Sequence, residues 1–142
     1  MKMGDGGFRP AINVCAATAG SELGGPRTVI AVAVTNVGSD MGAMTPMLAQ
    51  IEGRTGTLPE TVLADANHAK HEAIIAASAR GIDVLCPVPS GSRAPGTHKN
   101  DEPEIEAWKV RMQTERAKEL YRARAGLCEW TNAQFAGRFD LR

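Results

Sequence analysis

The sequence predicts an α/β fold in which helices flank a mixed β-sheet. Apolar, β-branched runs of strand length occur at residues 11–17, 27–35, 61–65 and 82–88. Between the later runs lie segments whose apolar residues recur every three or four positions, as in amphipathic helices. Because helices alternate with the later strands, we expect that part of the sheet to be parallel.

Composition predicts one soluble cytoplasmic domain. The chain has 142 residues, of which 43% are hydrophobic and 23% charged, as in ordinary globular proteins. Sixteen basic and sixteen acidic residues balance, which argues against a protein dedicated to nucleic-acid binding. The three cysteines lack the spacing of a metal or redox motif and are expected to be reduced thiols. The sequence contains no apolar run of about 20 residues, so we expect no membrane association.

The first two apolar runs are expected to form an antiparallel hairpin, because glycines and Pro26 lie between them. The second run, residues 27–35, is almost continuously apolar, which is typical of a central strand. A helix is expected over residues 41–54, with Ser39 or Asp40 as its N-cap. Its buried face would be formed by Met44, Met47, Leu48 and Ile51.

A second helix is expected over residues 69–79, with Gly81 just after its end. The residues predicted to share its apolar face are Ile74, Ile75 and Ala79. Residues 89–103 lack periodicity and are predicted to be a loop. From Pro103 a long helical pattern begins, and the sequence leaves open whether Gly126 divides it into two helices.

Asp65 is the first candidate for chemistry. It ends a predicted strand, and ligands of α/β sheets bind outside the carboxyl ends of strands. Glu129, in the long helical pattern, could return to the same place, and carboxylates are the ligands that Mg²⁺ prefers. The alternatives are that Asp65 caps the next helix and that Glu129 is a solvated helix residue. A two-metal site usually needs at least three acids.

Histidine and basic side chains extend this hypothesis. His68 and His71 could join Asp65 in a zinc or manganese site, although surface histidines give the same pattern. A basic stretch could contact phosphates or simply be a solvated helix face; it contains Arg116, Lys118, Arg122 and Arg124. Arg122 and Glu129 are seven residues apart, so they are expected on one helix face. Cys128 is interpreted as a core residue.

Several segments together resemble bacterial insertion-sequence transposases with a DDE catalytic domain. The resemblance covers essentially the whole chain, and the order of the segments is more specific than any one of them. The segments are Met1–Val14, Val34–Asp40, Leu63–Asp65, Arg80–Val84, Cys86–Pro89 and Trp108–Gln134.

The resemblance implies an RNase H-like fold that is incomplete at the N-terminus. It assigns the second catalytic acid to Asp65 and the third to Glu129, both as ligands of Mg²⁺ or Mn²⁺. Tyr121, Arg124 and Glu129 are similar to the helix signature of the family, and Tyr121, Arg122 and Arg124 are the implied DNA contacts. The implied activity is metal-dependent DNA cleavage and strand transfer during transposition.

The chain also departs from the family pattern. The first catalytic acid would lie on a strand upstream of Met1, and we expect the N-terminal DNA-binding region of the family to be absent as well. Asp5 lies in a glycine-rich segment and is not interpreted as a replacement for that acid. Ala19 and Ala33 stand where polar or acidic residues are expected, and Ile12 stands where an aromatic residue is usual.

We therefore expect residues 1–142 to be the C-terminal part of a transposase catalytic domain, inactive alone. The alternative is a noncatalytic remnant that binds DNA or a transposase. The expected partners are DNA and transposase chains, including copies of this one, since an exposed sheet edge invites association.

Overall fold

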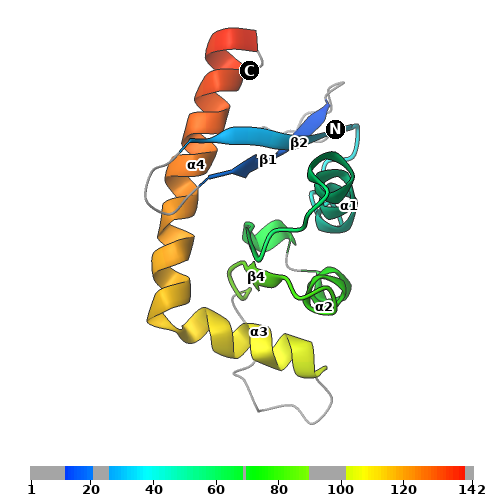
Figure 1. The fold of residues 1–142 in the computed structure, drawn as a ribbon, viewed down its shortest axis with the longest axis vertical. Helices are drawn as coiled ribbons and strands as arrows, with labels where there is room; N and C mark the ends of the chain where they lie inside the picture. The colour runs from blue at the N-terminus through cyan, green and yellow to red at the C-terminus, as the bar shows by residue number, and fades with distance from the viewer. Residues whose placement is uncertain (1–11, 21–25, 69, 90–101, 140–142) are drawn as a thin grey trace.

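The computed structural model of this chain describes residues 12–20, 26–68, 70–89 and 102–139. Within these ranges the protein has a mixed α/β fold, with four α-helices and two small sheets of two strands each (Figure 1). The predicted α/β class is confirmed. The strands of the described residues form two separate pairs, whereas the sequence suggested one mixed sheet.

The first sheet is the antiparallel pair β1 (Asn13–Ala19) and β2 (Thr28–Thr35), as the sequence predicted. The register shifts between Ala17 and Thr18, which is a bulge that increases the local twist. The prediction that the second run is a central strand is wrong within the described residues, because β2 pairs only with β1. The apolar run places Ala31 in the core, while Val34 on the same strand is 61% exposed.

Helix α1 (Met44–Thr55) buries Met44, Met47, Leu48 and Ile51, which confirms the predicted face. It ends at Gly56, whose φ of 72° is the left-handed conformation that glycine adopts without a steric penalty. The predicted cap is wrong. The N-cap is Ala43 and no side chain caps the helix. The Ser39 hydroxyl accepts the N–H of Met41, and the carboxylate of Asp40 bonds to β1 instead.

The second sheet is the parallel pair β3 (Thr61–Leu63) and β4 (Asp83–Leu85), connected through α2 (His71–Ser78). The predicted parallel portion is therefore confirmed. The buried residues of α2 are Ala73, Ile74 and Ala77. Of the predicted face, Ile74 is buried, Ile75 is only partly buried, and Ala79 is exposed just beyond the last helical residue, Ser78.

The C-terminal helical pattern forms two helices, α3 (Pro103–Gln113) and α4 (Glu115–Phe139). The break falls at Thr114 and not at Gly126, which lies inside α4. Thr114 has the extended angles φ −70° and ψ 145°, and its hydroxyl accepts the N–H of Ala117. A threonine in this role is a typical N-cap, so Thr114 starts a new helix in a new direction.

The core is centred on Trp108 of α3, which is fully buried. Its indole N–H donates to the carbonyl of Cys86 at 3.2 Å, just beyond β4. The other large, fully buried side chains are Ile74, Ile82, Val84, Leu85, Cys86 and Ile105. All three cysteines are free thiols.

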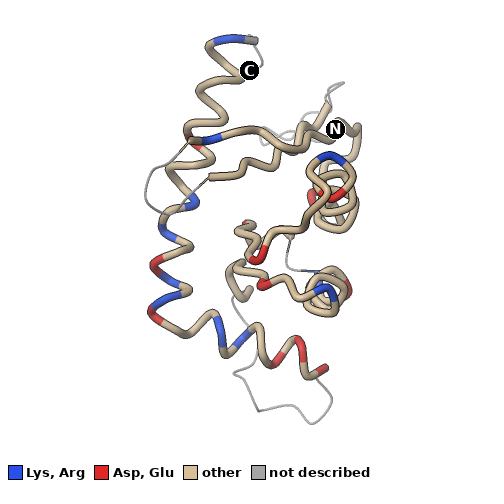
Figure 2. The backbone as a smooth tube through the Cα atoms, viewed as in Figure 1, with Lys and Arg blue, Asp and Glu red and all other residues tan. Residues whose placement is uncertain are grey.

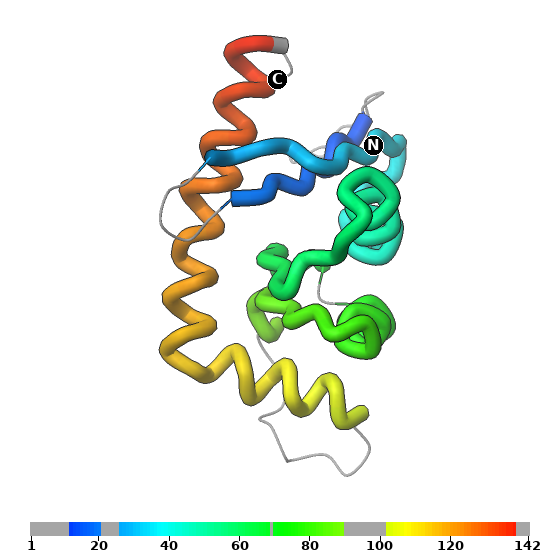
Figure 3. Tube along the Cα trace, viewed as in Figure 1, coloured from blue at the N-terminus to red at the C-terminus, as the bar shows by residue number. Residues whose placement is uncertain are grey.

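Helix α4 runs past both sheets (Figure 3). At β1 the hydroxyls of Thr18 and Thr131 lie 2.6 Å apart, so α4 is fixed to the first sheet by a side-chain hydrogen bond. None of the helices in the described ranges has the length and apolar character needed to cross a membrane.

Candidate functional site

Asp65 lies two residues beyond β3, at the start of the short 3-10 turn η1 (Ala66–His68). Its Oδ1 accepts the N–H of Asn67 at 3.0 Å and lies 2.9 Å from Nδ1 of His68. Asp65 therefore caps this turn, whereas the alternative that the sequence left open was a cap on the next helix, expected over residues 69–79. It does not cap α2, whose N-cap is Lys70.

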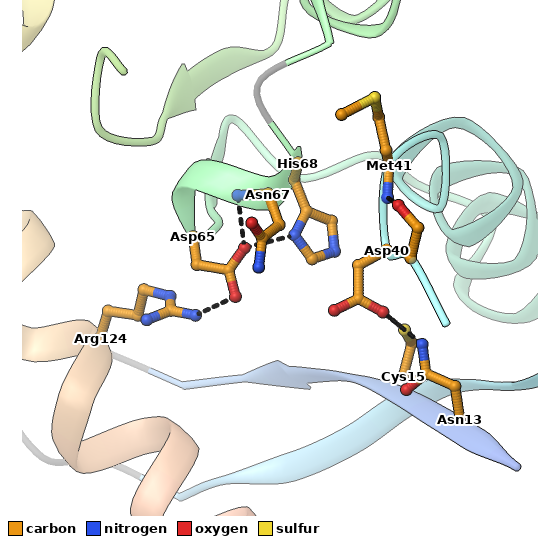
Figure 4. A network of polar contacts seen from close by, with 9 residues as sticks. Asn13, Cys15, Asp40, Met41, Asp65, Asn67, His68 and Arg124 are labelled. Carbon is orange, nitrogen blue, oxygen red and sulfur yellow. Dashed lines mark hydrogen bonds and ion pairs between the residues drawn. The ribbon is translucent and has the colours of Figure 1, made fainter. Parts of the chain in front are cut away.

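The other carboxylate oxygen of Asp65 faces α4. Oδ2 lies 3.5 Å from Nη2 of Arg124 (Figure 4). The Arg124 guanidinium lies over the ring of Tyr121, 5.8 Å from its centroid. Arg124 thus contacts two other residues that the sequence singled out, Asp65 just beyond β3 and Tyr121 on α4.

The surroundings of Asp65 favour its charged form. Partial burial raises the pKa of this carboxyl, but the hydrogen bond and charge of His68, the amide of Asn67 and the charge of Arg124 together lower it below its ordinary value. Burial also raises the pKa of the nearby Tyr121 phenol, which stays a neutral hydrogen-bonding group at physiological pH.

Glu129 does not lie beside Asp65. It is exposed, and it follows Arg124 by five residues, which at about 100° per residue turns it about 140° around the helix. The contacts of Asp65 in the described part of the chain are instead with Asn67, His68 and Arg124. Arg122 is exposed as well, on the side of α4 that it shares with Glu129, as their seven-residue spacing predicts.

The histidines do not converge on a metal site. His71 packs edge-on against Trp108, with ring centroids 6.2 Å apart, whereas His68 contacts Asp65. Within the described ranges no group of three or more His, Cys, Asp or Glu side chains could hold a metal ion. Since Glu129 also faces away, the side chains present do not by themselves fit a bound Mg²⁺ ion.

Sequence reasoning missed a second polar cluster beside Asp65. The Asp40 carboxylate accepts the side-chain amide of Asn13 and the thiol of Cys15, the latter at 3.2 Å. Figure 4 shows the ring of His68 between the carboxylates of Asp40 and Asp65. The available signal in the sequence was strand periodicity: side chains of a β-strand point alternately to its two faces, so Asn13 and Cys15 of β1 lie on one face.

The Asp40 cluster makes Cys15 a poor nucleophile. Burial, the hydrogen bond to Asp40 and the negative charges of Asp40 and Asp65 raise the pKa of the Cys15 thiol to about 11. The cluster therefore has a structural role at the junction of β1 with the loop before α1.

Comparison of the chain with protein-family models, with curated proteins and with solved structures found no match. The resemblance to DDE transposases therefore remains a prediction from the sequence.

Proposed function

We propose that this chain is the C-terminal part of the RNase H-like catalytic domain of an insertion-sequence DDE transposase. In this proposal it acts in DNA cleavage and strand transfer but is inactive alone. The observation that carries the proposal is the contact between Asp65 and Arg124, at 3.5 Å. The two residues belong to separate segments of the resemblance, and they meet beside the end of β3.

The local architecture agrees with this assignment. An acid at the end of a strand in a parallel β3–α2–β4 unit lies where α/β sheets bind ligands. From the helix signature of the resemblance, Arg124 contacts this acid from α4, and Tyr121 lies under the Arg124 guanidinium.

The geometry also supports inactivity of the isolated chain. Both carboxylate oxygens of Asp65 are engaged, one by His68 and Asn67 and the other by Arg124. Glu129 points elsewhere, and a pair of catalytic metal ions needs more carboxylates than Asp65 alone. We therefore assign no step of strand transfer to these side chains alone.

DNA would contact α4. Basic residues are spaced along this helix (Figure 2). Arg122 is exposed, and Arg27 donates to the carbonyl of Gly126 at 3.1 Å, which places a second guanidinium against the same helix. Guanidinium groups bind backbone phosphates by charge and hydrogen bonding without reading sequence.

DNA binding by the full chain tests this assignment. A short fluorescent duplex should bind at low salt and dissociate as salt rises, because phosphate contacts release counterions. Arg122→Ala should weaken binding and reduce the salt slope by about one. Arg138→Ala is the matched control, an exposed arginine in the last turn of α4, and should have a smaller effect. No binding at low salt would refute the DNA contact.

Catalysis is tested separately. The purified chain should not nick supercoiled plasmid DNA in Mg²⁺ or Mn²⁺. If the chain does nick the plasmid and Asp65→Asn abolishes this activity, the proposal that the chain is inactive alone is refuted. Inverted repeats flanking the coding region, or an upstream reading frame that encodes a strand with a further catalytic acid, would establish the transposase origin. Flanking DNA with neither feature would count against it.

One observation favours a second candidate, a noncatalytic remnant that binds DNA or a transposase. The ion pair with Arg124 and the hydrogen bond with His68 give Asp65 a structural role that needs no metal. The two candidates differ when an upstream catalytic fragment is supplied. If the mixture nicks DNA in a metal-dependent way and Asp65→Asn abolishes the nicking, the result supports the transposase. If the mixture binds DNA but does not nick it, the result supports the remnant.

A further inference from the structure

Two arginines of α4, two residues apart, have different surroundings. Arg122 is exposed, whereas Arg124 is partly buried, with its side chain 26% exposed. Two residues turn an α-helix by about 200°, so the two side chains leave α4 on different faces. Figure 4 shows the Arg124 side chain extending from α4 toward Asp65, beyond the end of β3. Arg122 is therefore open to a ligand from solvent, whereas Arg124 is occupied by the protein itself.

The contact with Asp65 uses the nitrogen of Arg124 that phosphate binding most requires. Oδ2 of Asp65 lies 3.5 Å from Nη2 of Arg124. A guanidinium group binds a phosphate through two parallel N–H donors, either those of Nη1 and Nη2 or those of Nε and Nη2. Because Nη2 belongs to both pairs, a phosphate that binds Arg124 through two donors must take the place of Asp65.

The ring of Tyr121 helps to hold Arg124 beside Asp65. The Arg124 guanidinium lies over this ring, 5.8 Å from its centroid. The two residues are three positions apart on α4, a spacing that places side chains on one face of a helix. The attraction between a cation and the face of an aromatic ring favours this position. The Arg124 side chain is thus fixed by two contacts, one with a carboxylate and one with an aromatic ring.

The charge of Asp65 acts in the same direction as its contact. Although partial burial raises the pKa of the Asp65 carboxyl, the hydrogen bond and charge of His68, with smaller effects from other neighbours, lower it below its ordinary value. Asp65 is therefore ionised at neutral pH. A negative charge at this position attracts the Arg124 guanidinium and repels a phosphate group.

We propose that Asp65 restrains phosphate binding at Arg124: the two side chains form an intramolecular ion pair, and the guanidinium binds a phosphate only when that pair opens. The identity of the phosphate ligand as DNA rests on the proposed function, whereas the restraint rests on the contacts of Asp65, Arg124 and Tyr121. Arg122, on another face of α4, binds the DNA backbone without this restraint. The resemblance implies that both arginines contact DNA, and the proposed restraint makes one of these contacts conditional.

A double-mutant cycle of DNA binding by the full chain tests the restraint. The native chain, Asp65→Asn, Arg124→Ala and the double variant are compared with a short fluorescent duplex at low salt. Arg124→Ala should weaken the binding of Asp65→Asn about threefold more than it weakens the binding of the native chain, as expected for an ion pair of this exposure. His68 is present in all four proteins, so its own effect on binding cancels in this ratio.

The salt dependence of binding gives a second readout. Each phosphate contact changes the slope of log K against log salt by about 0.9. Asp65→Asn should therefore steepen the slope by about one, and Arg124→Ala in the same protein should remove that increment. A purely structural role of Asp65 would not add a phosphate contact.

Arg122→Ala is the matched control, because it removes the same charge from the same helix on a face away from Asp65. Its effect on the binding constant should be the same in the native chain and in Asp65→Asn. Circular dichroism shows whether each variant folds. If Asp65→Asn does not fold, Asp65→Ser replaces it, since a serine hydroxyl can still accept the N–H of Asn67.

A second probe, inorganic polyphosphate, separates the restraint from the proposed function, because it presents phosphates without sugar or base. If the cycle is non-additive with polyphosphate but the duplex does not bind, the restraint stands and the DNA contact of the proposed function is refuted. Additive effects of Asp65→Asn and Arg124→Ala on every probe that binds would overturn the restraint and leave the DNA contact intact. Equal non-additivity with Arg122→Ala would also overturn the restraint. If neither probe binds any of the proteins, both the restraint and the DNA contact are refuted.

Discussion

Arg124 of α4 contacts Asp65 beyond β3, with 3.5 Å between the guanidinium nitrogen and the carboxylate oxygen. On the same helix, Thr131 is hydrogen-bonded to Thr18 of β1. Helix α4 therefore contacts both sheets, and in the described residues no backbone hydrogen-bond ladder joins the two sheets directly. The candidate site and the relative position of the two strand pairs depend on the same helix.

The energetic coupling between Asp65 and Arg124 should be measurable but small. The side chains are 37% and 26% exposed, and solvent-screened ion pairs contribute about 0.2–1 kcal/mol. A double-mutant cycle with Asp65→Asn and Arg124→Met, measured by urea unfolding, should give a coupling near the middle of that range. A coupling energy indistinguishable from zero would show that the contact between Asp65 and Arg124 does not stabilise the position of α4.

Acid should remove the contribution of Asp65 to stability. The pKa of Asp65 is lowered in the folded state, so its stabilising effect is fully present above the ordinary value of 3.8 and is lost as pH falls through the folded value. The difference in unfolding free energy between the native chain and Asp65→Asn should therefore shrink as the pH falls below about 4. A difference that grows as the pH falls below about 4 would contradict the assigned direction.

The position of Asp65 could be predicted because an apolar run ending in an acid is a local pattern. Its partner Arg124 could be placed on the same helix as Glu129, but which of them faces the sheet depends on the rotation of α4 about its axis. That rotation is fixed by packing, for example by Thr131 against β1. Local spacing therefore identified the helix but not the side chain that contacts Asp65.

The error at Asp40 has a similar cause. A short acid just before a helix is a common N-cap, but here Asn13 and Cys15 on β1 compete for the carboxylate. Those contacts join residues far apart in the sequence. The break between α3 and α4, in contrast, had a local signal in Thr114, whereas a glycine such as Gly126 destabilises a helix by only about 1 kcal/mol and does not end it.

Trp108 should be the most sensitive core position. The side chain is fully buried, and replacing a buried tryptophan with alanine typically lowers the unfolding free energy by about 3–5 kcal/mol. Trp108→Phe keeps most of the packing but leaves the buried Cys86 carbonyl without its donor, which should cost about 1–3 kcal/mol. Urea unfolding followed by circular dichroism gives both values. Equal losses in the two variants would show that the hydrogen bond, and not the volume of the ring, dominates.

Alkylation of the thiols tests the cluster around Asp40. The thiolate is the reactive form, and a pKa of about 11 leaves Cys15 almost entirely protonated at neutral pH. Asp40→Asn removes a negative charge 3.2 Å from the sulfur, so the pKa should fall and iodoacetamide should modify Cys15 faster. Cys86 is the internal control, because burial raises the pKa of its thiol to about 12 and Asp40 does not contribute to that increase. Mass spectrometry of the labelled peptides distinguishes the sites. If the alkylation rates of Cys15 and Cys86 rise together, the substitution has loosened the fold. If neither rate rises, Asp40 does not control the reactivity of the Cys15 thiol.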